Sequence, residues 1–310
     1  MDNDGKLSIF KECFASLSIR ELNDRINFYR TLNFKAISEE RLKQEIRKLC
    51  TVNFRGEDVS FFMNKDTYTR QFERFHFYRV RKFTEGDYDA LTNFNFPSLQ
   101  SVSDIWAKPA ELVNTPGRLN RVHNSVFYAA KEAANAVYET LCEPGDLFFL
   151  LVYSNKKQMR LTQIHDVPYL DELTEEENAK RLLLHNFLLT EFTKTVPPGW
   201  EHLYRSSILI YEEYFKGPKM DALCYPSTRT DINTGFNIAF EDRLAKENLN
   251  FLGLMVCQLL PPGEGSNLRL NIVYDGFFEN EAFTFYPVNS TTSRAKFGDF
   301  VMLRDIGVLC

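Results

Sequence analysis

The chain has 310 residues, enough for one large domain or two smaller ones with a core that needs no disulfides. Apolar residues make up 44% and charged residues 25%, as in soluble globular proteins, and no stretch reaches the roughly 20 uncharged residues of a membrane span. With 37 basic and 42 acidic residues the net charge is −5, which provides no general basic field for a nucleic-acid backbone. We therefore expect no membrane partner and no direct nucleic-acid partner.

Several functional classes lack their sequence signals. The N-terminal sequence has neither the basic segment nor the apolar stretch of a secretory signal, which predicts a cytoplasmic protein. The six cysteines are scattered without a CxxC pair and indicate buried free thiols. The five histidines show no HExxH or HxH spacing, so we predict no metal. Kinase and Rossmann interpretations lose their basis because no glycine-rich phosphate loop of either type is present.

Two amphipathic helices are predicted in the first 50 residues. Ser18 precedes a glutamate by three residues, the spacing of a capping box, and apolar residues then recur on one face. The second helix follows Ser38 and extends to Cys50, with acidic residues at its start and basic residues at its end, as the helix dipole favours. We predict that residues 1–66 form an N-terminal helical extension and that residues 67–310 form the main domain.

The main domain is predicted to combine short strands with helices. Alternation over residues 74–80 indicates a half-buried strand, and residues 125–128 form another before an alanine-rich helix over residues 129–141. The apolar run 147–153 predicts a buried strand, and a capping box at Thr174 opens a long helix. These elements predict a mixed α+β fold. Further strands are predicted over residues 220–225, 236–240, 252–260, 268–274 and 282–286.

Four short motifs occur in order along the main domain. Residues 77–81 contain a Tyr-Arg pair on a strand, and residues 116–120 read Pro-Gly-Arg-Leu-Asn. Tyr128 lies on the next strand and Glu139 on the helix that follows it, and residues 225–229 read Tyr-Pro-Ser-Thr-Arg. Each motif alone is a weak signal. Together and in this order they resemble the RES domain, a family named for its arginine, glutamate and serine.

The resemblance covers roughly residues 74–243 and implies a mainly antiparallel sheet core similar to that of ADP-ribosyltransferases. It implies an enzyme that degrades NAD by cleaving the bond between nicotinamide and ribose, usually the toxin of a toxin–antitoxin pair. NAD would be a substrate and not a true cofactor, and water or inorganic phosphate would accept the ADP-ribose. The resemblance also implies a helix-turn-helix antitoxin as a protein partner.

The same resemblance gives roles to the charged candidates. Glu139 is the main catalytic candidate, because a carboxylate near the anomeric carbon can stabilise an oxocarbenium-like transition state. Arg79 and Arg118 are candidates for binding the pyrophosphate, because a guanidinium forms paired charge-assisted hydrogen bonds with phosphate oxygens. Arg118 and Ser227 are also placed with Glu139 in the catalytic set. Arg81 lies on the same face of the strand as Arg79 and is the alternative to it, although we prefer Arg79.

The uncharged candidates would surround the substrate. Tyr78 and Tyr128 could stack against its flat rings, and Ser227 and Asn120 could form hydrogen bonds with it. Each candidate also has a structural interpretation. Tyr128 could be a core aromatic, Asn120 could stabilise its own turn, and Glu139 could be a solvated helix carboxylate.

Two further functions stay open at this point. The same pocket could transfer ADP-ribose to a macromolecule, or the chain could be a non-catalytic interaction module. The N-terminal helices have no counterpart in the resemblance and motivate the second alternative. They could dock an antitoxin, form a homo-oligomer or regulate the site, and the sequence does not choose between these roles.

Overall fold

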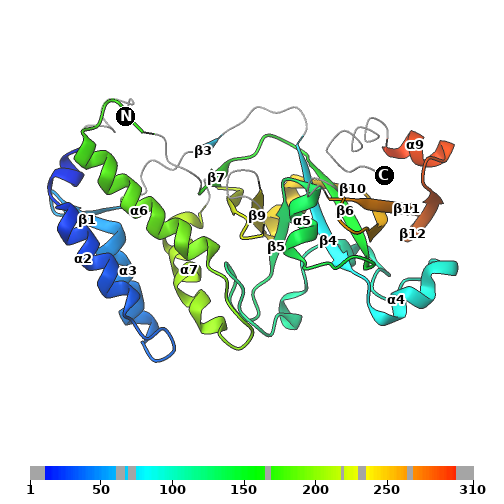
Figure 1. Cartoon of the computed structure of the whole chain (residues 1–310), viewed down its shortest axis with the longest axis horizontal. Coiled ribbons are helices and arrows are strands. Elements are labelled where there is room, and N and C mark those ends of the chain that lie inside the picture. The colour runs from blue at the N-terminus through cyan, green and yellow to red at the C-terminus, as the bar shows by residue number, and fades with distance from the viewer. Residues whose placement is uncertain are drawn as a thin grey trace. The chain divides into compact units, whose positions relative to one another are not determined.

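The computed structural model describes residues 11–60, 67–68, 75–164, 169–217, 220–229, 235–263 and 268–297. The chain forms two compact units whose segments alternate along the sequence (Figure 1). The first unit contains residues 1–68, 113–124 and 160–226. The second unit contains residues 69–112, 125–159 and 227–310. The chain therefore passes from one unit to the other several times.

The second unit is built on an antiparallel sheet. Its strands are β4 (His76–Lys82), β5 (Val126–Ala130), β6 (Leu147–Asn155), β9 (Phe236–Glu241), β10 (Leu249–Leu259), β11 (Leu270–Glu279) and β12 (Ala282–Pro287). Within this unit the strands lie in the order β12-β11-β10-β6-β4-β5-β9. Every one of these neighbouring pairs is antiparallel.

Strand β6 lies between β10 and β4, and both of its faces are covered. Phe148, Leu150 and Val152 face the core cluster beneath α5 (Ala133–Glu139). Phe149 lies on the opposite face of the strand, where its ring contacts the rings of Phe83 and Phe96. A strand buried on both faces needs a continuous apolar run, which explains why the predicted strand over residues 147–153 is confirmed.

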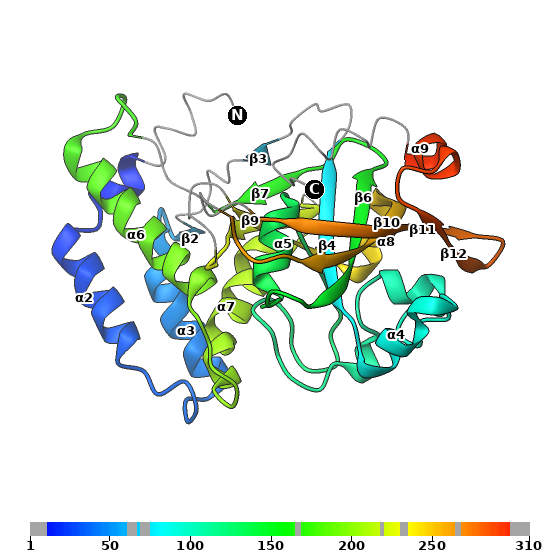
Figure 2. The same cartoon turned by 45° about the vertical axis from the view of Figure 1, so that its right-hand side comes forward.

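Helix α5 packs against β4, β5 and β9. Figure 2 shows it beside β4 and β9. The sequence predicts this helix from residue 129, but the prediction is wrong at its start. Ala129 and Ala130 continue β5 and pair with Ile238 and Asn237 of β9. Alanine favours helix only weakly, and the strand ladder outweighs that preference until the chain turns into α5 at Ala133.

The other predicted strands of this unit are confirmed with shifts of a few residues at their ends. Arg74, where the first of them was predicted to begin, lies outside the described residues. Sequence periodicity misses the short helices because they have only three to seven residues, too few for a repeating apolar pattern. These are α4 (Glu85–Asp89), η1 (Ala90–Thr92), η2 (Val102–Ile105), η3 (Ala110–Leu112), α8 (Asp242–Asn248) and α9 (Thr291–Phe297).

The first unit is mainly helical. Its helices are α2 (Ile19–Arg30), α3 (Glu39–Cys50), α6 (Glu175–Thr193), η4 (Glu201–Leu203), α7 (Tyr204–Ile210) and η5 (Tyr211–Phe215). Helix α2 packs against α3 and α6, and α7 packs against α3 and α6. Its strands are β1 (Thr51–Phe54), β2 (Glu57–Ser60), β3 (Thr67–Tyr68), β7 (Leu161–Gln163) and β8 (Ala222–Pro226). The pair β7 and β8 is parallel, so the fold is α+β with mixed, mainly antiparallel strands.

The predicted helix starts of this unit are confirmed by their caps. The Ser18 hydroxyl accepts a hydrogen bond from the Glu21 amide at 3.1 Å, and Ser38 caps α3 in the same way. Thr174 and Glu177 form the full reciprocal capping box of α6. Each cap satisfies amide groups that have no partner within the helix.

The predicted N-terminal extension over residues 1–66 falls within the first unit. That unit also includes α6 and α7, so the extension packs on helices from the middle of the chain. The boundary between residues 66 and 67 stays a prediction.

Five cysteines lie in the described ranges, and all carry free thiols. Four of them are buried, as predicted, and Cys142 is partly buried. Cys310 and His165 lie outside these ranges. Every helix within them is too short or too polar to span a lipid bilayer.

Asp87 in α4 provides a first test of the second unit. It is fully buried, and its carboxylate accepts hydrogen bonds from the Thr84 amide at 2.7 Å, the Thr84 hydroxyl at 2.6 Å and the Ser98 amide at 3.0 Å. Burial raises the pKa of Asp87, but these hydrogen bonds together lower it by more than burial raises it. The pKa of Asp87 therefore lies below its ordinary value. We expect Asp87→Ala to lower the free energy of unfolding by roughly 3 kcal/mol, measured by urea denaturation at pH 7.

The matched control is Asp89→Ala, an exposed aspartate on the same helix, which we expect to change stability little. Because the pKa of Asp87 is lowered in the folded chain, its stabilisation is present above the ordinary aspartate pKa and is lost as the pH falls through the lowered value. The difference in free energy of unfolding between wild type and Asp87→Ala should therefore become smaller at acidic pH. An equal loss for the two variants at pH 7 would contradict this assignment.

Candidate functional site

The candidate site is a cavity of about 220 Å³ in the second unit, at the place where two neighbouring strands separate. In the described residues β4 and β5 pair at a single position, Tyr78 with Ala130. The separation leaves space that neither strand's backbone fills. The cavity is lined by Tyr78, Arg79, Val80, Tyr128, Ala129, Ala130, Ala136, Glu139, Thr140 and Asn237.

Glu139 is the last residue of α5, and its carboxylate is fixed by two donors. The Ser227 hydroxyl donates to Oε1 at 2.6 Å, and the Asn237 amide donates to the same atom at 2.7 Å. Oε2 accepts no hydrogen bond from the part of the chain that the structure describes. Glu139 is half-buried and lines the cavity. One oxygen is therefore held in place while the other is available to a ligand.

The two donors are themselves held. The Asn135 amide donates to Oδ1 of Asn237 at 3.2 Å, which fixes which end of the Asn237 side chain faces Glu139. The Ser227 hydroxyl accepts from the Arg229 amide at 3.0 Å, so its own proton is directed to the carboxylate. Asn135, Asn237 and Ser227 are buried. Buried and hydrogen-bonded partners hold a functional group with little freedom to move.

Two buried donors among the residues that line the cavity have no partner in the described residues. The Tyr78 hydroxyl is one, and Nη1 of Arg79 is the other. Burial raises the pKa of the Tyr78 hydroxyl, with a further contribution from Glu132, and burial lowers the pKa of Arg79. Buried polar groups are nearly always hydrogen-bonded in folded proteins. Both residues are among those that line the cavity.

The structure distinguishes the two arginines of β4. Arg79 lines the cavity, and its guanidinium carbon lies 5.1 Å from the centre of the Phe127 ring. Arg81 donates to the backbone oxygen of Asp104 at 2.6 Å and does not line the cavity. The two arginines thus differ in their contacts, and the preference for Arg79 over Arg81 stays a prediction.

The remaining candidates of this unit differ in position. Tyr128 is half-buried and lines the cavity. Ser227 has no exposed surface and does not line it, because its hydroxyl lies against Glu139. The geometry gives Ser227 a positioning role toward the carboxylate, and direct contact of Ser227 with a substrate stays a prediction.

Arg118 and Asn120 lie in the first unit. The guanidinium carbon of Arg118 lies 5.7 Å from the centre of the Tyr204 ring and 5.6 Å from that of Tyr225. Asn120 is buried, and its side-chain amide donates to the Arg121 carbonyl at 3.1 Å within its own turn. Their predicted contacts with a substrate stay predictions.

Sequence reasoning missed Asn237 and Asn135 as site residues. Asn237 lies in β9, and asparagine is depleted in strands, so its presence in an apolar strand was the available signal. Asn135 is a buried polar residue in an alanine-rich helix, but no sequence pattern indicates its partner. Across the described residues, no group of histidine, cysteine, aspartate or glutamate is arranged to hold a metal ion.

The fold and cavity define a class: an α+β protein with a fixed carboxylate in a cavity between separated antiparallel strands. Comparison with protein-family models matches residues 78–250 to the RES domain, which is more than half of the chain. The chain therefore belongs to the RES domain family. No curated protein and no solved structure matches it. Likeness of the sheet to ADP-ribosyltransferases stays an expectation.

The hydrogen bond from Asn237 to Glu139 can be tested by Asn237→Asp. This variant would place a second carboxylate beside that of Glu139, where the Asn237 side-chain amide now donates at 2.7 Å. Repulsion between the two carboxylates should destabilise the fold at pH 8 by roughly 2 kcal/mol. As the pH falls to 5 the pair can share a proton, and the loss should shrink. Thermal unfolding of wild type and Asn237→Asp between pH 5 and pH 8 measures this loss of stability. A loss of stability that does not change with pH would contradict the contact between Asn237 and Glu139.

Proposed function

We propose that the chain is an NAD-degrading enzyme that cleaves the bond between nicotinamide and ribose. The observation that carries the proposal is the carboxylate of Glu139, which is held through one oxygen and lines a cavity that Arg79 also lines. A sugar carbon that becomes cationic needs a carboxylate, and the anionic part of a dinucleotide needs a cation. Membership of the RES domain family supports the same reaction.

The cleavage itself places modest demands on the protein. In NAD the ring nitrogen of nicotinamide carries a positive charge, so the bond between it and the anomeric carbon can break without prior protonation. The bonding electron pair leaves with nicotinamide, which becomes neutral, and positive charge develops on the ribose. Glu139 would stabilise that charge, or orient a ribose hydroxyl, through the oxygen that is not held by Ser227 and Asn237.

The dimensions of the cavity limit what it can take. Its volume of about 220 Å³ is below the roughly 300–1,000 Å³ of pockets that enclose a whole drug-sized ligand. We therefore place the nicotinamide riboside part beside Glu139, with Tyr128 and the buried Tyr78 as walls. Arg79 keeps its predicted role of pairing with the neighbouring phosphate. Arg118 and Asn120 keep their predicted roles toward the substrate.

The acceptor completes the reaction. An oxygen of water or of inorganic phosphate forms a new bond to the anomeric carbon, and the acceptor's proton passes to Glu139 or to solvent. Water gives ADP-ribose, and phosphate gives its 1″-phosphorylated form. We propose these acceptors in a cytoplasmic toxin that a helix-turn-helix antitoxin silences. Transfer to a macromolecule is the alternative outcome.

The decisive variant is Glu139→Gln, which keeps the shape of the side chain and removes its charge. We expect wild type to release nicotinamide from NAD and Glu139→Gln to do so at least about 100-fold more slowly. Reactions with and without inorganic phosphate, with products separated by chromatography, identify the acceptor. Glu143→Gln is the matched control, because Glu143 is an exposed glutamate just after the same helix and should retain activity.

The outcomes separate the alternatives. Label from NAD that appears on protein or nucleic acid would identify a macromolecular acceptor. Absence of both NAD cleavage and NAD binding in wild type would reject the enzymatic proposal and favour a non-catalytic interaction module. Equal activity of wild type and Glu139→Gln would remove Glu139 from the catalytic set.

The arginine assignment has its own test. We expect Arg79→Met to lower kcat/KM for NAD by about 100-fold, because a desolvated guanidinium that pairs with phosphate contributes roughly 3 kcal/mol. Arg81→Met should change kcat/KM less than about threefold, since Arg81 bonds a backbone oxygen outside the cavity. Steady-state kinetics on both variants measures this. The reverse ranking would transfer the role to Arg81.

A further inference from the structure

Residues 113–124 form a loop within the first unit that carries Arg118. The loop is closed by its own backbone: the Gly117 amide donates to the Asn120 oxygen at 3.0 Å, and the His123 amide donates to the Val113 oxygen at 2.9 Å. These bonds set the local turn. They do not fix the loop against the helices of the unit, so its position depends on other contacts.

Arg118 is held in place by aromatic rings while one of its donor atoms has no partner in the described residues. Its guanidinium lies over the rings of Tyr204 and Tyr225, and its buried Nη1 has no hydrogen-bond partner among the described residues. Its backbone oxygen accepts from the Ser207 hydroxyl of α7 at 2.7 Å. The Arg118 side chain can keep this placement only while the loop stays against α7.

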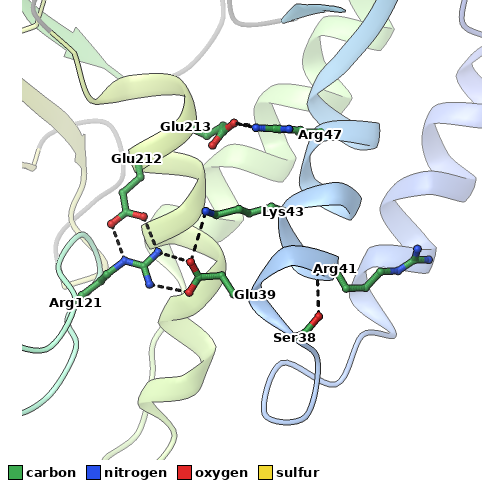
Figure 3. A network of polar contacts seen from close by, with 8 residues as sticks. All are labelled: Ser38, Glu39, Arg41, Lys43, Arg47, Arg121, Glu212 and Glu213. Atoms are coloured by element: carbon green, nitrogen blue, oxygen red, sulfur yellow. Dashed lines mark hydrogen bonds and ion pairs between the residues drawn. The ribbon is translucent and has the colours of Figure 1, made fainter.

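Arg121, three residues further along the loop, is held by two glutamates (Figure 3). Its Nε and Nη2 donate to the two carboxylate oxygens of Glu212 at 2.8 and 2.7 Å. Its Nη1 and Nη2 donate to the two oxygens of Glu39 at 2.8 and 3.0 Å. Hydrogen bonding to Arg121 lowers the pKa of Glu39 below its ordinary value. Both pairs are bidentate, the arrangement that fixes a guanidinium in direction as well as distance.

The two glutamates come from different parts of the unit. Glu39 is the first residue of α3, in the predicted N-terminal extension, and Glu212 lies in η5, directly after α7. The Arg121 cluster, defined as Arg121, Glu39 and Glu212, therefore joins the extension, the loop and the α7–η5 segment. Its side chains are partly exposed, so we expect a small contribution to stability and a larger one to geometry.

We propose that Arg121 is a positioning residue: through Glu39 and Glu212 it holds the loop so that Arg118 is placed to bind the phosphates of the substrate. The N-terminal extension then belongs to the binding machinery, because it supplies Glu39. The family match covers residues 78–250 and so does not contain that glutamate. This inference rests on the proposed function for the identity of the substrate, but the holding of the loop can be measured without it.

The chain offers a matched control. Arg47 of α3 donates to Glu213 of η5, so it joins the same two elements one residue away from Glu212. Arg47 makes no hydrogen bond or ion pair with residues 113–124 in the described part of the chain (Figure 3). Arg47→Met therefore removes an ion pair between α3 and η5 and leaves the contacts of the loop intact.

The experiment compares wild type, Arg121→Met, Glu39→Gln and Arg47→Met in the full-length protein. A loop released from α7 loses the packing that keeps its internal turn bonds closed, so its amides should open more often. Hydrogen exchange read by mass spectrometry should therefore show the amides of residues 113–124 exchanging at least about tenfold faster in Arg121→Met, with Glu39→Gln intermediate and Arg47→Met unchanged. Steady-state kinetics with NAD should show KM raised about tenfold by Arg121→Met, with kcat within about twofold of wild type. Thermal unfolding should give similar midpoints for Arg121→Met and Arg47→Met.

The two readouts distinguish the possible failures. Unchanged exchange in Arg121→Met would overturn the positioning role whether or not the chain degrades NAD. If wild type cleaves NAD, and Arg121→Met shows faster exchange but the same KM for NAD as wild type, the position of the loop does not affect substrate binding. A wild type that leaves NAD intact would reject the proposed function, and the exchange data would then decide the holding of the loop alone. If Arg47→Met raises KM as much as Arg121→Met does, the effect comes from weaker packing between α3 and η5 and not from the position of the loop.

Discussion

Two hydrogen bonds to one oxygen of Glu139 organise the second unit's cavity. The donors come from Ser227, after β8, and from Asn237 in β9, while the carboxylate ends α5. These bonds therefore connect segments far apart in the sequence at the side chain proposed to act in catalysis. A carboxylate held through one oxygen can meet developing charge without first reorganising, which is the main way in which fixed protein groups lower a barrier. The separation of β4 from β5 supplies the space in which that charge would develop.

The arginines are arranged by a different principle. Arg79 and Arg118 each lie over an aromatic ring and each keep a buried nitrogen without a partner, although they belong to different units. Aromatic faces hold a guanidinium in place without using its donors, so the fork stays free for an oxyanion. Arg121 shows the opposite use, since its donors are engaged by two carboxylates. Arginine thus keeps donors available where its partners are rings, and has its donors engaged where its partners are carboxylates.

The sequence predicted elements whose signals are local. Capping residues at Ser18, Ser38 and Thr174 determined where helices begin, and the apolar run of β6 revealed a strand covered on both faces. It failed where a distant strand decided the outcome, as at Ala129 and Ala130, whose pairing with β9 outweighs their helix preference. The same limit applies to the site. The order of the motifs indicated Glu139, but the bond from Asn237 depends on β5 pairing with β9, which no local pattern encodes.

The position of β10 has a consequence for what counts as a minimal unit of this protein. The segment that matches the RES domain ends at residue 250, just after β10 begins, while β10 covers the whole length of β6. A chain that stopped there would leave the central apolar strand as an open edge, with unpaired amides and carbonyls along a hydrophobic surface. Such edges recruit other strands and promote aggregation. The last strands, which lie beyond the family match, thus cover the edge of β6, and a chain cut at the end of that match should expose it.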